Sequence, residues 1–191
     1  DYLTAFSKNN VHLCTDAIAE IDRSDIVLAN GERHSVDVIV QATGFKPFDV
    51  QESARVIGED GRSLQDAWKT QSKSHRGVMA EGFPNLFFLI GPNSGTGHTS
   101  ALIAAEAQIG YVIGCIKLLR KRNLNVIAPR SSYVSQYNQR IQKDMQRKVY
   151  SGGCGAWYTN DNDENYTLWP YSATRQMAEL LRVNPGEFEL R

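Results

Sequence analysis

The sequence has few cysteines and no excess of charge of either sign. Its 191 residues include three cysteines, Cys14, Cys115 and Cys154, and 21 basic against 21 acidic side chains. An odd number of widely spaced cysteines argues against a disulfide framework or a zinc cluster and favours a reducing, cytoplasmic location. The balanced charge gives no electrostatic case for binding nucleic acid or an anionic membrane, and neither a signal peptide nor a membrane span is evident.

The sequence also lacks a recognisable catalytic or metal-binding constellation. No Ser/His/Asp or Cys/His arrangement stands out, so we assign no catalytic residue. Asp161, Asp163 and Asn165 resemble the start of a calcium loop. However, Tyr166 replaces the required glycine and Ser172 stands where the bidentate Glu belongs. We therefore expect a solvated turn and no metal site.

What the sequence does contain is a strand–turn–helix pattern between residues 84 and 121. The apolar run 85–90, with two adjacent phenylalanines, predicts a strand that is covered on both faces, as in a parallel sheet. A long helix is predicted to follow the turn. Its apolar residues recur mostly at three- and four-residue steps and predict one apolar face: Leu102, Ile109, Val112, Ile113, Ile116 and Leu119.

The turn between this strand and this helix is rich in glycine. Gly91, Gly95 and Gly97 permit positive φ and close approach of another molecule to the backbone. Thr99 or Ser100 can cap the helix. Free N–H groups and the positive end of the helix dipole then suit an electron-rich ligand.

Several interpretations of this turn compete. A phosphate-binding P-loop needs a lysine where His98 stands, and five residues rather than four separate Gly91 from Gly97. A Rossmann fingerprint fits loosely as Gly95-x-Gly97-x-x-Ser100, without the later acidic residue that would bind a ribose. A third interpretation is a backbone contact to a flavin ring. The remaining alternative is a capped core helix that follows a flexible loop.

The segment before this pattern is predicted to form strands. Short apolar runs within residues 11–36 indicate an antiparallel meander, with a hairpin turn at Asn30-Gly31. The β-branched run 38–40 favours a central strand. The small residues Ala42, Thr43 and Gly44 after it would let the backbone pass close to a ligand or another strand.

The segment after the long helix changes character along its length. Ser131 or Ser132 is predicted to cap a second helix. Its expected buried face comprises Tyr133, Val134, Tyr137, Ile141 and Met145. From residue 151 the chain is rich in Gly, Asn, Asp and aromatic residues, which is typical of a functional or mobile loop, and a last helix is expected over 172–183.

Three motifs together resemble the C-terminal part of class B flavoprotein monooxygenases, most of all Baeyer–Villiger monooxygenases. They are DVIVQATGF, GFPNLFFLIGPNSGTGHTS and the later CGAWY…LWP. The resemblance implies that FAD and NADPH are the cofactors and that Trp157 lies in a mobile loop covering NADPH. The other residues that the resemblance places near FAD are Thr43, Gly44, Gly91, Pro92, Asn93, Thr99 and Ser100.

The resemblance also implies an incomplete α/β flavoprotein fold. Residues 1–150 would form the C-terminal half of an FAD-binding domain, with a β-meander, parallel strands and the long helix. Residues 151–191 would form the cofactor and substrate loop and a C-terminal helix. The strand–GxGxxG–helix (Rossmann) unit expected before them, the NADPH domain and the catalytic arginine are absent from this chain. A sheet edge would then be exposed unless the missing N-terminal half covers it, and this edge offers a route to a homodimer.

The expected function is therefore one part of a monooxygenase. The intact enzyme would insert one oxygen atom from O₂ into a ketone or oxidise a soft heteroatom, and this chain alone would be inactive. The alternatives are a non-catalytic interaction module and a P-loop-like nucleotide-binding protein.

Overall fold

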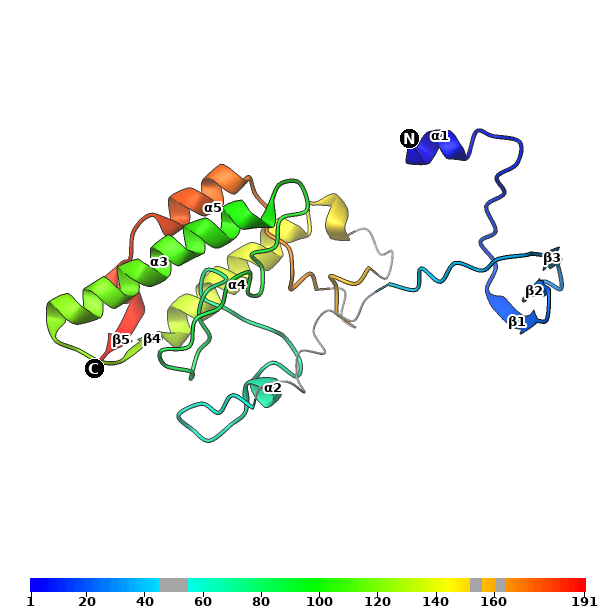
Figure 1. Cartoon of the computed structure of the whole chain (residues 1–191). Coiled ribbons are helices and arrows are strands. Elements are labelled where there is room, and N and C mark those ends of the chain that lie inside the picture. The colour runs from blue at the N-terminus through cyan, green and yellow to red at the C-terminus, as the bar shows by residue number, and fades with distance from the viewer. Residues whose placement is uncertain (45–54, 152–155, 161–163) are drawn as a thin grey trace. The chain divides into compact units, whose positions relative to one another are not determined.

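The computed structural model describes residues 1–44, 55–151, 156–160 and 164–191. The chain divides into two compact units, Asp1–Gly44 and Phe45–Arg191 (Figure 1). This structural boundary differs from the functional division expected after residue 150, which stays a prediction. Cys154 and the calcium-loop-like residues Asp161 and Asp163 lie outside the described residues.

The first unit is a small antiparallel meander preceded by the short helix α1 (Tyr2–Ala5). Strand β2 (Asp25–Leu28) pairs with both β1 (Ile18–Asp22) and β3 (Arg33–Ser35). The predicted hairpin turn is confirmed, since Gly31 has a φ of 86° and its N–H donates to Leu28 O. Leu28 is the only buried residue of this unit, so the meander has almost no core of its own.

The predicted central strand at 38–40 is not formed. Val38, Ile39 and Val40 are exposed and irregular. A central strand needs a paired neighbour on each side. The three-stranded sheet of this unit ends at β3, and no other described strand pairs there. The expectation of a parallel strand at this position is therefore wrong for this chain.

The second predicted strand, 85–90, is also absent. Asn85 and Ile90 both have positive φ, at 60° and 57°, so the backbone turns at each end of the run. The side chain of Asn85 fixes the first turn, because it donates to Asn125 O and accepts from the N–H of Ile127. Within the described residues both sheets are antiparallel, and the parallel pairing amounts to the single bridge between Gly95 and Leu168.

The second unit is built mainly from helices. It contains α2 (Leu64–Ala67), α3 (Ala101–Arg122), α4 (Ser131–Met145) and α5 (Ala173–Leu180). Two 3₁₀ turns, η2 (Val149–Ser151) and η3 (Pro185–Glu187), follow α4 and α5. Strand β4 (Ile127–Pro129) pairs antiparallel with β5 (Phe188–Leu190), and α5 packs along α3 (Figure 1).

The helix predictions are largely confirmed. Ser100 caps α3, with its Oγ accepting from the N–H of Leu102. Ser172 caps α5 in the same way. Helix α4 buries most of the predicted face, although its N-cap is Arg130 rather than a serine, without a side-chain cap. The core formed by these elements comprises Val78, Met79, Tyr111, Cys115, Ile127, Leu180 and Phe188.

Most of the predicted apolar face of α3 is exposed, and of its six residues Val112 and Leu119 are partly buried and pack against the core. The helix buries Ala104, Gln108, Tyr111 and Cys115. The exposed side carries Leu102, Ile103, Ile109, Ile113 and Ile116. We call this exposed set the outer face of α3. By length and composition α3 could cross a membrane, but core helices of soluble proteins pass the same test and α3 packs against α5.

Candidate functional site

The glycine-rich turn before α3 is enclosed by the protein at its first half. Pro92, Asn93 and Ser94 are all buried. Asn93 adopts a φ of 56°, which asparagine tolerates better than most residues. Its Nδ2 donates to the carbonyl oxygens of Asn165 and Leu168, at 2.8 and 3.3 Å. The Asn93 side chain therefore holds the turn to the 165–168 segment.

The backbone of this turn is occupied by the same segment. The N–H of Asn93 donates to Tyr166 O, and the N–H of Gly95 donates to Thr167 O. A P-loop needs free amides to cradle phosphates. Because these two amides are already bonded within the protein, the geometry argues against the P-loop interpretation.

The three glycines of the turn are closely approached by other parts of the chain, most tightly by backbone at Gly91. A Cβ at Gly91 would lie 2.6 Å from Gly77 O, and one at Gly95 would lie 3.2 Å from Thr167 O. At Gly97 a Cβ would lie 2.8 Å from the hydroxyl of Tyr150. None of the three has positive φ. The prediction that they serve positive φ was therefore wrong, and the close approach comes from the chain itself.

The second half of the turn, in contrast, is open. Gly97, His98 and Ser100 are exposed, and Thr99 is half-buried. The Thr96 hydroxyl donates to Thr99 O at 3.1 Å and orders the last residues before the helix. The 22-residue helix α3 thus presents its positive N-terminal end at an accessible position. This part of the turn can accept the electron-rich edge of a ligand.

An aromatic segment lies against this open helix start. The Tyr150 ring packs on Gly97. Tyr150 also makes an edge-to-face contact with Tyr158, with ring centroids 6.0 Å apart. Tyr158 in turn contacts Trp157 at 5.6 Å, and the Trp157 side chain is about half exposed (49%). The structure therefore connects two predicted parts of the site, the helix start and Trp157.

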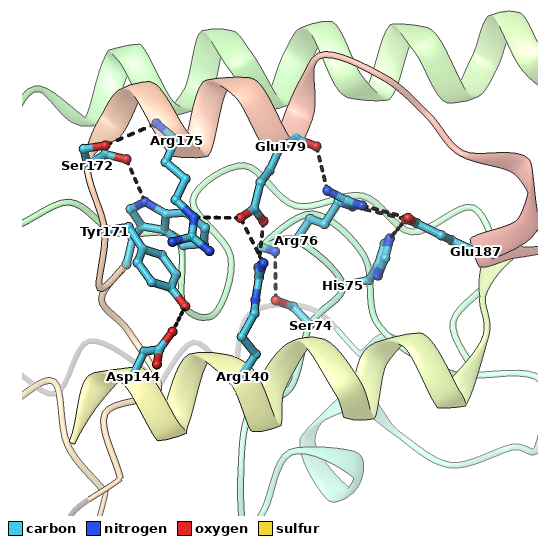
Figure 2. A network of polar contacts seen from close by, with 12 residues as sticks. Ser74, His75, Arg76, Arg140, Asp144, Tyr171, Ser172, Arg175, Glu179 and Glu187 are labelled. Atoms are coloured by element: carbon cyan, nitrogen blue, oxygen red, sulfur yellow. Dashed lines mark hydrogen bonds and ion pairs between the residues drawn. The ribbon is translucent and has the colours of Figure 1, made fainter. Parts of the chain in front are cut away.

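A largely buried ion cluster joins His75 and Arg76 to Glu187 (Figure 2). Glu187 accepts from His75 Nε2 at 2.9 Å and from two nitrogens of Arg76, at 2.7 and 3.2 Å. Ser74 lies next to this cluster in the chain, and its Oγ donates to Pro92 O at 2.8 Å. The cluster thus fixes the 74–76 segment, and this segment is hydrogen-bonded to the turn through Ser74.

The charge states of this cluster follow from its burial. Burial lowers the pKa of His75 below its usual 6.5, in spite of the hydrogen bond to Glu187. Burial alone would raise the pKa of Glu187, but hydrogen bonds from His75 and Arg76 lower it to about 2. A neutral His75 therefore donates from Nε2 to an ionised Glu187. The charge of Glu187 is balanced by Arg76, which indicates a structural role.

A second part of the network joins the two helices that flank the cluster. Arg140 of α4 makes a bidentate ion pair with Glu179 of α5, at 2.7 and 3.0 Å. Arg175 also bonds to Glu179 and stacks over the ring of Tyr171, 3.7 Å from its centroid. Tyr171 donates to Asp144, so the network continues to the end of α4 (Figure 2).

The predicted site residues fall into three groups. Gly91, Pro92 and Asn93 belong to the enclosed half of the turn, whereas the open helix start holds Thr99 and Ser100. Thr43 and Gly44 are exposed at the end of the first unit, and Gly44 has a φ of 88°. The sequence analysis missed the supporting side chains Ser74, His75, Arg76, Gln108, Tyr150, Asn165 and Glu187. It also missed Gln176, whose Nε2 donates to Ser94 O at 3.0 Å. Gln108, which together with Glu106 interrupts the apolar first part of α3, was the available signal.

Comparison with known proteins gives a consistent result. No family model matches the chain. A Baeyer–Villiger monooxygenase of Pseudomonas aeruginosa is 38% identical over 89% of the chain. One of Streptomyces coelicolor is 35% identical over 99% of the chain, and an FAD-binding monooxygenase of Aspergillus niger is 32% identical over 100%. The chain covers 33%, 37% and 32% of these proteins, about a third of their length.

Solved structures show the same fold. A structure of OTEMO in complex with FAD and NADP matches the whole chain with a TM-score of 0.78 at 23% identity. Cyclohexanone monooxygenase from Rhodococcus sp. Phi1, bound to NADP⁺, matches with a TM-score of 0.76 at 21% identity. In both cases the chain covers 37% of the known structure. The resemblance predicted from the motifs is confirmed: the chain is homologous to Baeyer–Villiger monooxygenases over about a third of their length.

Proposed function

From this homology we propose that the chain is the C-terminal part of an FAD- and NADPH-dependent monooxygenase of a reducing, cytoplasmic compartment. The intact enzyme would insert one oxygen atom from O₂ into a ketone or oxidise a soft heteroatom. The observation that carries the proposal is the accessible N-terminus of α3 beside the segment of Trp157. The comparisons support it because relatives and structural neighbours are named for FAD and NADP.

The residues present fit a flavin at the helix start. Residues 97–100 are at least partly accessible, and the dipole of α3 favours the ring edge that gains negative charge on reduction. The flavin and NADPH supply the redox chemistry when bound. Thr99 and Ser100 would contact FAD directly, whereas Asn93 would act by fixing the turn. Trp157 would cover NADPH, and Thr43 and Gly44 would lie beside FAD through their exposed backbone.

The surface of the chain supports an additional N-terminal part. The outer face of α3 and the β-branched run 38–40 are exposed, and the first unit has a single buried residue. Apolar surfaces of this kind are normally covered by protein. In the intact enzyme a strand–GxGxxG–helix unit would supply that cover and the FAD pyrophosphate site. The chain alone would then bind FAD weakly and have no turnover.

The coding DNA upstream of Asp1 provides the direct test. We expect it to encode a glycine-rich dinucleotide-binding unit, and the longer product to purify with a flavin absorption band that the 191-residue chain lacks. Ser100→Pro, which removes the capping hydroxyl, should reduce flavin retention in the longer product, whereas Ser132→Pro on α4 serves as the control. Upstream DNA without such a unit, or turnover by the isolated chain, would contradict the proposal.

A second candidate is a non-catalytic interaction module. The outer face of α3 favours it, because this face could join two copies of the chain, and an exposed strand edge could do the same. A colourless and stable dimer in gel filtration, together with no flavin-binding unit upstream, would favour the module over the enzyme.

A further inference from the structure

The contact between Tyr150 and Gly97 joins two segments that are far apart in the sequence. Tyr150 belongs to η2, which is anchored to the end of α4 because Ser151 Oγ donates to Met145 O at 2.9 Å. Tyr150 leaves little room for a side chain at Gly97, because a Cβ added there would lie 2.8 Å from the tyrosine hydroxyl. Any movement of the Tyr150 ring therefore changes the packing of the residues before α3.

The same ring is in contact with the segment of Trp157. Tyr150 and Tyr158 meet edge to face, with an interplanar angle of 84°, and Tyr158 meets Trp157 at 73°. Edge-to-face pairs at such distances are favourable and set the orientation of both rings. Tyr150 thus contacts both Tyr158, in the Trp157 segment, and Gly97, in the turn before α3.

A second set of contacts links the Trp157 segment to the turn before α3. Thr159 forms an antiparallel bridge with Asn165. Asn165 O accepts from Asn93 Nδ2, and Asn165 is buried. The Trp157 segment is therefore linked to both halves of the turn: from Thr159 through Asn165 to the enclosed half, and from Tyr158 through Tyr150 to the open half.

We propose that Tyr150 is a positioning residue that couples the segment of Trp157 to the N-terminus of α3. The functional meaning of this coupling rests on the proposed function. If Trp157 covers NADPH and the helix start contacts FAD, binding of one cofactor favours the conformation that binds the other. By linkage, the effect of each cofactor on the affinity for the other is then equal.

The coupling can be tested without any cofactor, by hydrogen exchange in the 191-residue chain. Gly97→Ala places a methyl group against the Tyr150 hydroxyl, so we expect roughly tenfold faster amide exchange at 102–105 and at 156–160. Tyr150→Leu should accelerate exchange at the same two places. The double variant should be no faster than either single variant, because both remove one contact.

The conservative variant provides the rescue. Tyr150→Phe removes the hydroxyl and keeps the ring, so Gly97→Ala/Tyr150→Phe should regain most of the lost protection at both segments. Tyr133→Leu, the same change at a tyrosine in the first turn of α4, is the matched control and should leave both segments unchanged. Independent effects that multiply in the double variant, or protection lost at 156–160 alone, would overturn the proposal. Both outcomes are separate from the presence of a flavin-binding unit upstream.

Discussion

The two faces of helix α3 differ in an unexpected way: polar side chains are buried on the inner face and apolar side chains are exposed on the outer face. The inner face buries a glutamine and a tyrosine, and Gln108 is fully used: its Oε1 accepts from the N–H of Ile90 and its Nε2 donates to Gly77 O. The outer face exposes leucine and isoleucine side chains. A helix with apolar residues around most of its circumference is typical of one covered on all sides. The described part of the chain therefore covers the inner face of α3 and leaves the outer face exposed.

The largest expected effect is on the inner face. Tyr111→Ala should lower the free energy of unfolding by about 3–5 kcal/mol, because it empties a fully buried site beneath the Arg76 guanidinium. Ile113→Ala, on the outer face, should cost about 1 kcal/mol or less, since 45% of this side chain is already exposed. Urea unfolding followed by circular dichroism measures both. Equal losses would show that the two faces do not differ.

The ion cluster behind the inner face should show the next largest effect. Glu187→Gln removes the buried counter-charge of the part-buried Arg76, so we expect a loss of about 3 kcal/mol. Glu189→Gln is the matched control on the adjacent strand, because its pairing with Arg130 is exposed at 4.0 Å. The control should change stability by about 0.5 kcal/mol or less. A similar loss in both variants would mean that the burial of Glu187 is unimportant.

Structural features that depend on local sequence were predicted better than features that depend on distant parts of the chain. The meander with its Asn30-Gly31 turn, the limits of α3 and the cap at Ser100 follow from local signals and were predicted correctly. The runs 38–40 and 85–90 have the composition of central strands, but strand formation depends on neighbours. For 38–40 no described strand of its unit pairs there, and for 85–90 the turns at Asn85 and Ile90 intervene.

The location of the candidate site stays a prediction, and the contacts that build the turn before α3 were not predicted. The motif drew attention to the turn before α3, and the structure leaves part of that turn open. The glycines, however, are closely approached by Gly77, Thr167 and Tyr150. These partners are distant in sequence, and no local pattern points to them. The same holds for the ion cluster, since 111 residues separate Arg76 from Glu187.

Acid should destabilise the ion cluster of His75, Arg76 and Glu187, whereas the outer face of α3 consists of leucine and isoleucine side chains that do not titrate. The folded-state pKa of His75 lies below 6.5, so the unfolded chain binds more protons and stability falls as the pH drops below that value. The pKa of Glu187 is lowered from 4.5 to about 2, so its contribution is complete above 4.5 and is lost toward about pH 2. The urea midpoint of unfolding should therefore decrease as the pH is lowered from about 7 to about 3. In Glu187→Gln the part of the decrease below about pH 4.5 should be smaller; an unchanged slope would contradict the assignment.

The smallest expected effect in the 191-residue chain is also the one that tests the proposed N-terminal part most directly. Ile113→Lys places a charge on the outer face of α3, where the side-chain stem can lie along the helix and the ammonium group can reach water. We expect a change of about 0.5 kcal/mol or less in this chain. In the longer product the same lysine would be covered, and the loss should rise to several kcal/mol because a charge would be buried without a partner. Ile57→Lys, at an exposed residue outside α3, should give a small loss in both proteins. An equally small loss for Ile113→Lys in both would mean that the outer face stays open and that the N-terminal part packs elsewhere.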